Sequence, residues 1–129
     1  MSEKLATIKQ LEAAFSRDLR LLSSKDYAAV FNNRPIKLVC PSFTLLATPN
    51  KVSHARIGLI VAKKNVRFAV ERNRIKRLAR ETFRLNKHTL PHYDYVLLAR
   101  HGSSKLLNKV LSEHLEQLWS RARKKCVGY

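Results

Sequence analysis

The sequence predicts an α+β fold, a small single-domain α/β sandwich with the element order α-β-β-β-α-β-α. With 129 residues and 45% hydrophobic content, the chain suits one domain built on one modest core. Two or three short apolar runs precede the longest helical pattern, and one more follows it. Because strands and helices do not strictly alternate, a doubly wound parallel sheet is disfavoured.

The domain is expected to cover residues 15–125, preceded by an N-terminal extension at residues 1–14 that has weak helical character. The first helix of the domain is expected at residues 24–33. Ser23 and Asp26 have the spacing of a helix-capping pair, which fixes its start.

Tyr27 and Phe31 share one face of this short helix. Two interpretations stay open for them. Both rings can anchor the helix in the core. Alternatively, one ring lies in a groove and stacks on an unpaired base, a contact that tolerates any base sequence.

Three runs have the composition of strands. Residues 36–40 and 43–48 are β-branched or apolar and are separated by a proline, so they form two short strands or one broken strand. Residues 56–62 make the best strand pattern, and their nearly continuous apolar character predicts a central position in the sheet. Lys63 and Lys64 follow at its exit, beside the start of the next helix.

The most informative stretch is residues 63–84, which holds nine lysines and arginines against two glutamates. On a helix over residues 71–85, one side is a core-facing stripe and the other is a ridge of cations. The stripe comprises Ile75, Leu78, Ala79 and Thr82. The ridge comprises Asn73, Lys76, Arg77, Arg80 and Arg84. Solvated faces usually mix charges of both signs, so this ridge indicates a polyanionic partner.

The basic helix is expected to end near residues 86–87, and a strand is expected at residues 93–99. A last helix begins near Ser104 or Leu107, with Trp119 packing at the edge of its apolar stripe. The stripe comprises Leu107, Leu111, Leu115, Leu118 and Ala122.

The net charge of +17 and the pI near 10.6 are extreme for a chain of this size and point to nucleic acid. A membrane surface also attracts lysine and arginine, so charge alone does not decide the partner. There is no apolar run near the length of a membrane span, and the N-terminus lacks the features of a signal peptide. We therefore expect a cytoplasmic protein without a membrane partner.

The sequence predicts no catalytic residues and no metal site in the protein itself. The nine acidic residues are scattered, whereas a metal-dependent nuclease needs converging carboxylates. His88 and His92 are four residues apart, but Pro91 interrupts any helix between them. Two cysteines are too few for a disulfide framework. Cys40 is expected to be a small buried hydrophobe, and Cys126 is a tail residue to which the sequence assigns no role.

Residues 57–64 (IGLIVAKK) and 71–78 (ERNRIKRL) together resemble the protein subunit of bacterial ribonuclease P. The triplet at residues 72–74, Arg-Asn-Arg, is the signature of that family. The resemblance extends from about Phe15 to Ala122. A lone triplet would be weak evidence, but strand, double lysine, basic helix and later strand occur here in one register.

The resemblance implies a mixed central sheet with a left-handed crossover through the basic helix. It also implies that the RNA subunit of ribonuclease P is the catalyst and removes the 5′ leader of precursor tRNA. Mg²⁺ would be bound mainly by the RNA. The protein would bind the RNA subunit and the leader, improve substrate affinity and Mg²⁺ use, be inactive alone, and need no obligate protein partner.

The resemblance also implies site residues. Tyr27 and Phe31 match the aromatics of the leader cleft, while many relatives carry a further aromatic where Leu46 falls in this chain. Arg74 lies to one side of the ridge and is expected to support local structure. Contacts to the RNA subunit are expected from Lys63, Lys64, Arg72, Asn73, Lys76, Arg77 and Arg80.

Three alternative functions share this charge and size. The main one is a structural RNA-binding protein of the ribosomal type, which the identity of the RNA partner would distinguish. A DNA-binding regulator would need a helix and a short turn before the basic helix, where a strand is expected. A protein-only nuclease would cleave without an RNA cofactor.

Overall fold

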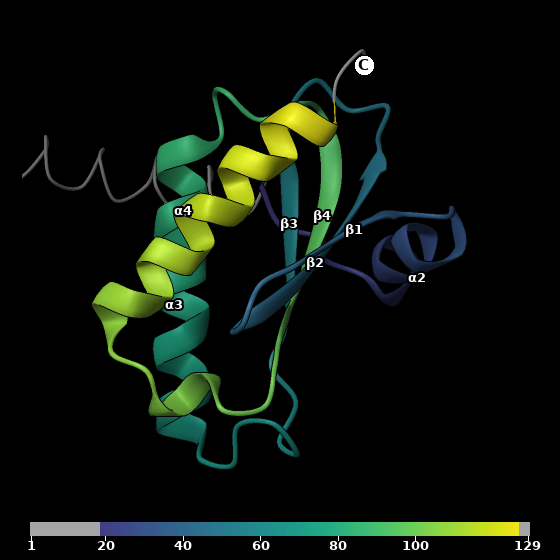
Figure 1. Ribbon diagram of the computed structural model, residues 1–129. Helices are drawn as coiled ribbons and strands as arrows, with labels where there is room; N and C mark the ends of the chain where they lie inside the picture. The colour runs from purple at the N-terminus through teal and green to yellow at the C-terminus, as the bar shows by residue number, and fades with distance from the viewer. Residues whose placement is uncertain (1–18, 127–129) are drawn as a thin grey trace, which may run out of the picture.

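The computed structural model describes residues 19–126, in which helices cover both faces of a four-stranded sheet (Figure 1). The elements follow the predicted order, and the predicted extension at residues 1–14 lies outside the described residues. In chain order they are α2 (Ser24–Asn32), β1 (Ile36–Val39), β2 (Phe43–Pro49), β3 (Arg56–Ile60), α3 (Ala69–Asn86), β4 (Tyr93–Ala99), the 3-10 turn η1 (Ser103–Lys105) and α4 (Asn108–Lys125).

The sheet is mixed, with the strand order β1-β2-β4-β3. The two apolar runs around the proline form two separate strands, β1 and β2, which pair as an antiparallel hairpin. Strand β4 lies antiparallel to β2 and parallel to β3. Parallel neighbours need a crossover connection, and α3 with its flanking turns provides it.

Strand β3 lies at the edge of the sheet, so the predicted central position is wrong. The segment before α2 covers its outer edge: the Ile57 N–H donates to the Leu19 carbonyl (2.6 Å), and the Leu21 N–H donates to the Ile57 carbonyl (2.9 Å). These bonds satisfy backbone groups that an open edge would expose. Ile57 and Gly58 are buried. The apolar character of this strand therefore reflects burial beneath the segment before α2. It does not reflect a central position between two strands.

Helices α3 and α4 pack together over one face of the sheet and enclose the main core (Figure 1). Its centre is aromatic, with the Phe83 and Tyr95 rings 5.6 Å and 6.2 Å from the Trp119 ring, measured between centroids. Trp119 is completely buried, and its Nε1–H donates to the Thr82 hydroxyl (3.1 Å). The packing role predicted for Trp119 is confirmed.

Helix α2 covers part of the opposite face, and its predicted cap is confirmed. The Asp26 N–H donates to the Ser23 hydroxyl (3.2 Å), and the Ser23 N–H donates to an Asp26 carboxylate oxygen (3.3 Å). These bonds satisfy backbone groups at the helix start. The smaller apolar cluster at this face comprises Leu21, Val30 and Val96, with Tyr27, Leu46, Ile60 and Leu98 packed against it.

Two residues near the C-terminus lie where the sequence did not place them. Leu107, predicted in the apolar stripe, is the N-cap of α4 and 74% exposed, because the helix begins only at Asn108. The other four residues of that stripe are buried. Cys126, which the sequence placed in the tail with no assigned role, is completely buried where α4 ends. Cys40 is buried, as predicted.

Candidate nucleic-acid interface

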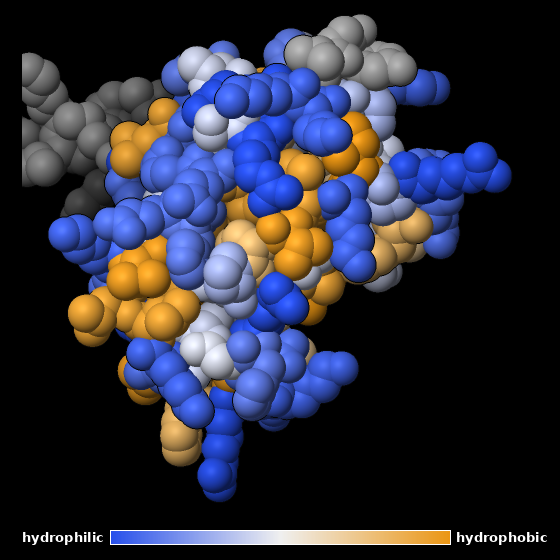
Figure 2. Space-filling model, in the orientation of Figure 1, coloured by the Kyte–Doolittle hydropathy of each residue, from blue (hydrophilic) through white to orange (hydrophobic). Residues whose placement is uncertain are grey.

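Helix α3 presents the two faces that its sequence predicted. Its core side buries Ile75, Ala79, Thr82 and Phe83, with Leu78 half-buried. On the other side Asn73, Arg77, Arg80 and Arg84 are exposed and Lys76 is half-buried. Figure 2 shows hydrophilic residues covering much of the face that α3 and α4 share, with apolar patches between them. A rigid helix thus holds several cations at fixed spacing, which suits a polyanion with regularly spaced charges.

Lys63 and Lys64 lie in the turn that follows β3, and both are exposed. The turn is closed by bonds from the N–H groups of Asn65 (3.0 Å) and Val66 (2.9 Å) to the Ala62 carbonyl. It leads into α3, so the two lysines precede the cationic ridge as predicted.

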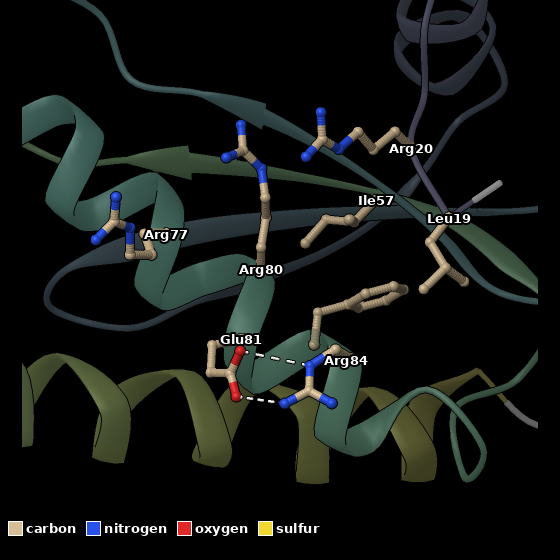
Figure 3. Close-up of a pocket in the computed structure, with 8 residues that line it drawn as sticks. Leu19, Arg20, Ile57, Arg77, Arg80, Glu81 and Arg84 are labelled. Atoms are coloured by element: carbon tan, nitrogen blue, oxygen red, sulfur yellow. Dashed lines mark hydrogen bonds and ion pairs between the residues drawn. The ribbon is translucent and has the colours of Figure 1, made fainter. Parts of the chain in front are cut away.

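A hollow lies where the middle of α3 meets the edge of the sheet (Figure 3). Arg80 enters it from α3 and Arg20 from the segment that covers β3, with Ile57 between them. Although Arg80 as a whole residue is exposed, partial burial of its guanidinium lowers its pKa, and the positive charge of Arg20 lowers it further. Because the two cations repel each other, an anion bound in the hollow between them would be stabilised by both.

Arg20 was not among the predicted site residues. Its stretch of sequence has no clear helical period, but Arg20 lies between the buried residues Leu19 and Leu21. This in-out-in alternation is typical of an extended segment and was the available signal.

Tyr27 lies beside the same cations. A groove, here named the α2–α3 groove, is lined by residues that include Arg20, Tyr27, Leu59, Lys76 and Arg80. The Tyr27 ring is half-buried and packs over Gly58, and its hydroxyl accepts a bond from the Leu59 N–H (3.1 Å). The groove therefore combines an aromatic ring with cations in its lining.

Phe31 is separate from this arrangement. Its side chain is 44% exposed on α2, and it does not line the α2–α3 groove. Leu46, on β2, is half-buried in the cluster beneath α2, where Tyr27 also packs. The structure thus brings Tyr27 together with Lys76 and Arg80, but it does not bring Phe31 into the same groove.

The side chains of Arg72 and Arg74 both donate hydrogen bonds to backbone carbonyls of segments next to α3. The Arg72 Nη1 donates to the carbonyls of Val66 (3.1 Å) and Arg67 (2.7 Å), which lie in the loop before the helix. Arg74 ties α3 to the start of α4, and its supporting role is confirmed. Its bonds reach Glu71 Oε2 (2.9 Å), Ser104 O (3.0 Å), Leu106 O (3.2 Å) and Asn108 Oδ1 (2.6 Å).

Three acidic side chains in the described part of the chain, Glu71, Glu81 and Asp94, form ion pairs with arginines. Asp94 accepts two bonds from Arg56 (2.8 and 2.7 Å) and one from the Asn50 amide (2.8 Å). Glu81 pairs with Arg84 (Figure 3). Across residues 19–126, no three His, Cys, Asp or Glu side chains converge as a metal-binding group.

None of the helices described here is long and apolar enough to cross a membrane.

The family model described as Ribonuclease P matches residues 15–123 of the chain. The ribonuclease P protein component of Photorhabdus laumondii is 52% identical over 111 residues, which cover 86% of this chain and 92% of the relative. The corresponding protein of Idiomarina loihiensis is 45% identical over 116 residues, which cover 90% of this chain and 93% of the relative.

Solved structures give the same result. The RNase P protein of Staphylococcus aureus superposes with a TM-score of 0.75 at 27% identity, covering 81% of this chain and 94% of that one. The RNase P protein of Thermotoga maritima superposes with a TM-score of 0.70 at 30% identity, covering 79% of this chain and 96% of that one. The mixed sheet and element order described above match these structures.

Proposed function

The chain belongs to the ribonuclease P protein family, and from this premise we propose that it binds the RNA subunit of ribonuclease P and the 5′ leader of precursor tRNA. Ribonuclease P is an endoribonuclease of tRNA processing. In the proposed division of labour the RNA subunit performs the cleavage, while the protein raises substrate affinity and improves the use of Mg²⁺. We expect it to act in the cytoplasm.

One observation carries the leader assignment: Tyr27, Lys76 and Arg80 line the same groove, the α2–α3 groove. An unpaired strand offers both a base face and a phosphate at each nucleotide. Aromatic stacking plus a cationic wall binds such strands with little dependence on base sequence. This is what a leader of variable sequence requires. Tyr27 is therefore proposed as the stacking residue, and Phe31 as a residue at the margin of the leader path.

The part of the cationic ridge outside the α2–α3 groove is proposed as the surface for the RNA subunit, while Lys76 and Arg80, expected from the sequence to contact that subunit, line the groove. Asn73 and Arg77 are exposed on the helix, and Lys63 and Lys64 are exposed on the preceding turn. Side chains on a rigid helix neutralise phosphates and release counterions, so the affinity should fall as salt rises. Arg72 is proposed to contact RNA only with donors other than the Nη1 that binds the loop carbonyls.

The Mg²⁺ that assists hydrolysis is proposed to be held mainly by RNA oxygens. Two observations are compatible with this division. Asp94 is committed to Arg56 and Asn50, and Glu81 to Arg84. Neither carboxylate is therefore available to bind a metal without giving up an ion pair.

The decisive experiment is cleavage of precursor tRNA at low Mg²⁺ with the protein alone, with ribonuclease P RNA alone, and with both. Strong cleavage only in the mixture supports the proposal. Cleavage by the protein alone would mean that it has its own active site. If the mixture is no better than RNA alone, a structural role on another RNA, such as ribosomal RNA, becomes the better explanation.

A further inference from the structure

Phe68 is an aromatic residue in an unusual place. It is the N-cap residue of α3, a position that normally favours a side chain able to accept a hydrogen bond, and it forms no such cap. Its side chain is 63% exposed. A single exposed apolar residue is ordinary, but this ring lies in the most basic part of the chain.

The exposure of Phe68 does not come from a loose loop. Val66, two residues earlier, is completely buried. The Arg72 guanidinium holds the Val66 and Arg67 carbonyls, and the Arg72 N–H donates to the Phe68 carbonyl (3.0 Å). The Asn65 side chain also donates to the Ala99 carbonyl of β4 (3.1 Å). The backbone on both sides of Phe68 is therefore fixed, and the ring is held outward.

The ring is surrounded by features that attract a phosphate. The Arg67 guanidinium lies over the ring, 5.4 Å from its centroid. Lys63 and Lys64 are exposed a few residues earlier in the same connection. The first N–H groups of α3 receive no side-chain cap, and the positive end of the helix dipole adds to them.

We propose that Phe68 is a stacking platform for one unpaired base of the ribonuclease P RNA subunit. With Arg67 on one face and 63% of the side chain still exposed, the ring can accept a base. The uncapped helix start and the nearby lysines would hold the adjoining phosphates. The inference rests on the proposed function and extends the RNA-subunit surface to a residue that is not a cation.

The RNA subunit is favoured over the leader by position along α3. Phe68 precedes Lys76, the nearest lining residue that α3 contributes to the α2–α3 groove, by eight positions. At 1.5 Å per residue this is about 12 Å along the helix. Phe68 also lies in the same connection between β3 and α3 as Lys63 and Lys64, which belong to the surface proposed for the RNA subunit.

The test measures binding of the full chain to ribonuclease P RNA, without precursor tRNA, for Phe68→Ala, Phe68→Leu and Phe68→Trp. Leucine keeps apolar area but removes the aromatic face, and tryptophan keeps the face. We expect alanine and leucine to weaken binding about tenfold and tryptophan to preserve it, given the usual strength of base stacking. The salt dependence should not change, because no charge is removed.

Leu85→Ala is the matched control. Leu85 is also an apolar residue of α3, is 65% exposed and lies near the other end of the helix. Its substitution should leave the affinity unchanged. Phe68→Trp adds a second readout: RNA should quench its fluorescence beyond any change in wild type, whose single tryptophan, Trp119, is completely buried.

The outcomes separate this inference from the proposed function. If wild type itself does not bind ribonuclease P RNA, the function fails and the inference with it. If wild type binds and all Phe68 variants bind equally well, only the inference fails. Equal binding by leucine and wild type, with weaker binding by alanine, would show an apolar contact without stacking and would also overturn it.

Discussion

The Tyr27 ring lies directly against the backbone of Gly58. A Cβ atom at position 58 would be 2.6 Å from Cε1 and 2.9 Å from the hydroxyl of that ring. The absence of a side chain on β3 is therefore what lets α2 approach the sheet this closely. The same contact sets the orientation of the one aromatic ring that lines the α2–α3 groove.

Gly58→Ala should displace the Tyr27 ring. The added methyl group cannot coexist with the ring in its present place, so the ring must turn away and give up its bond to the Leu59 N–H. We expect a loss of about 1–3 kcal/mol in the free energy of unfolding, as for other overpacked sites. Urea denaturation measures this. Unaltered NMR shifts of the Tyr27 ring in the variant would contradict it.

Tyr27→Ala should reduce the preference for precursor tRNA with a leader over one without. Tyr27→Phe keeps the stacking face and should retain most of that preference, although it removes the hydroxyl that binds the Leu59 N–H. Phe31→Ala should have the smaller effect, because Phe31 does not line the groove. Competition between the two substrates gives the preference directly. If Phe31→Ala proves the more damaging variant, the leader path runs elsewhere.

Arg74→Ala should mainly lower stability, whereas Arg77→Ala should mainly weaken RNA binding. Arg74 makes four structural contacts, so its loss should lower the free energy of unfolding by about 2 kcal/mol. Arg77 is exposed on the ridge and should leave stability within about 0.5 kcal/mol. Arg77→Ala should instead weaken RNA binding and reduce the slope of log K against log salt by about 1. An unchanged slope would remove Arg77 from the proposed interface.

Asp94→Asn should be strongly destabilising. The Asp94 and Arg56 side chains are only 10% and 22% exposed, and the substitution leaves the guanidinium without its counter-charge. We expect a cost of about 2–4 kcal/mol, slightly below that of breaking a fully buried pair. Glu81→Gln is the control, since its pair with Arg84 is exposed and should contribute little. Equal unfolding midpoints for both variants would contradict the prediction.

Stability should decline in alkali partly through Cys126. Burial raises the pKa of its thiol to about 11, above an ordinary value of 9.0. Because the folded state retains the proton more tightly, this contribution is complete below pH 9 and is lost as the pH rises toward 11. Urea denaturation of wild type and Cys126→Ala across this range should show the shallower decline in the variant. Parallel curves would mean that the thiol does not contribute.

The helices could be predicted from the sequence because the signals that define them are local. The Ser23–Asp26 cap and the Ile75–Ala79 spacing each lie within a few residues, and both were confirmed. The edge position of β3 was not predictable in this way, since its apolar run reflects burial by the Leu19–Leu21 segment, which is distant in sequence. Leu107 fits the period of the last helix but precedes its first turn.

The candidate site was predictable to the extent that it lies on one helix. A helix projection shows which side of α3 carries Arg77 and Arg80, but not what a long side chain reaches. It could not show that Arg72 turns back to the Val66 and Arg67 carbonyls. Nor could it show Arg20 facing Arg80, because that meeting depends on tertiary packing.

Strand β4 joins the β1–β2 hairpin to β3, and it is the last strand within residues 19–126. During synthesis the hairpin, β3 and the whole of α3 leave the ribosome before the strand that connects them. Until Ala99 has emerged, their apolar faces have no shared partner, and contacts distant in sequence form late. An interrupted chain thus exposes apolar surface, which invites proteolysis of the incomplete protein.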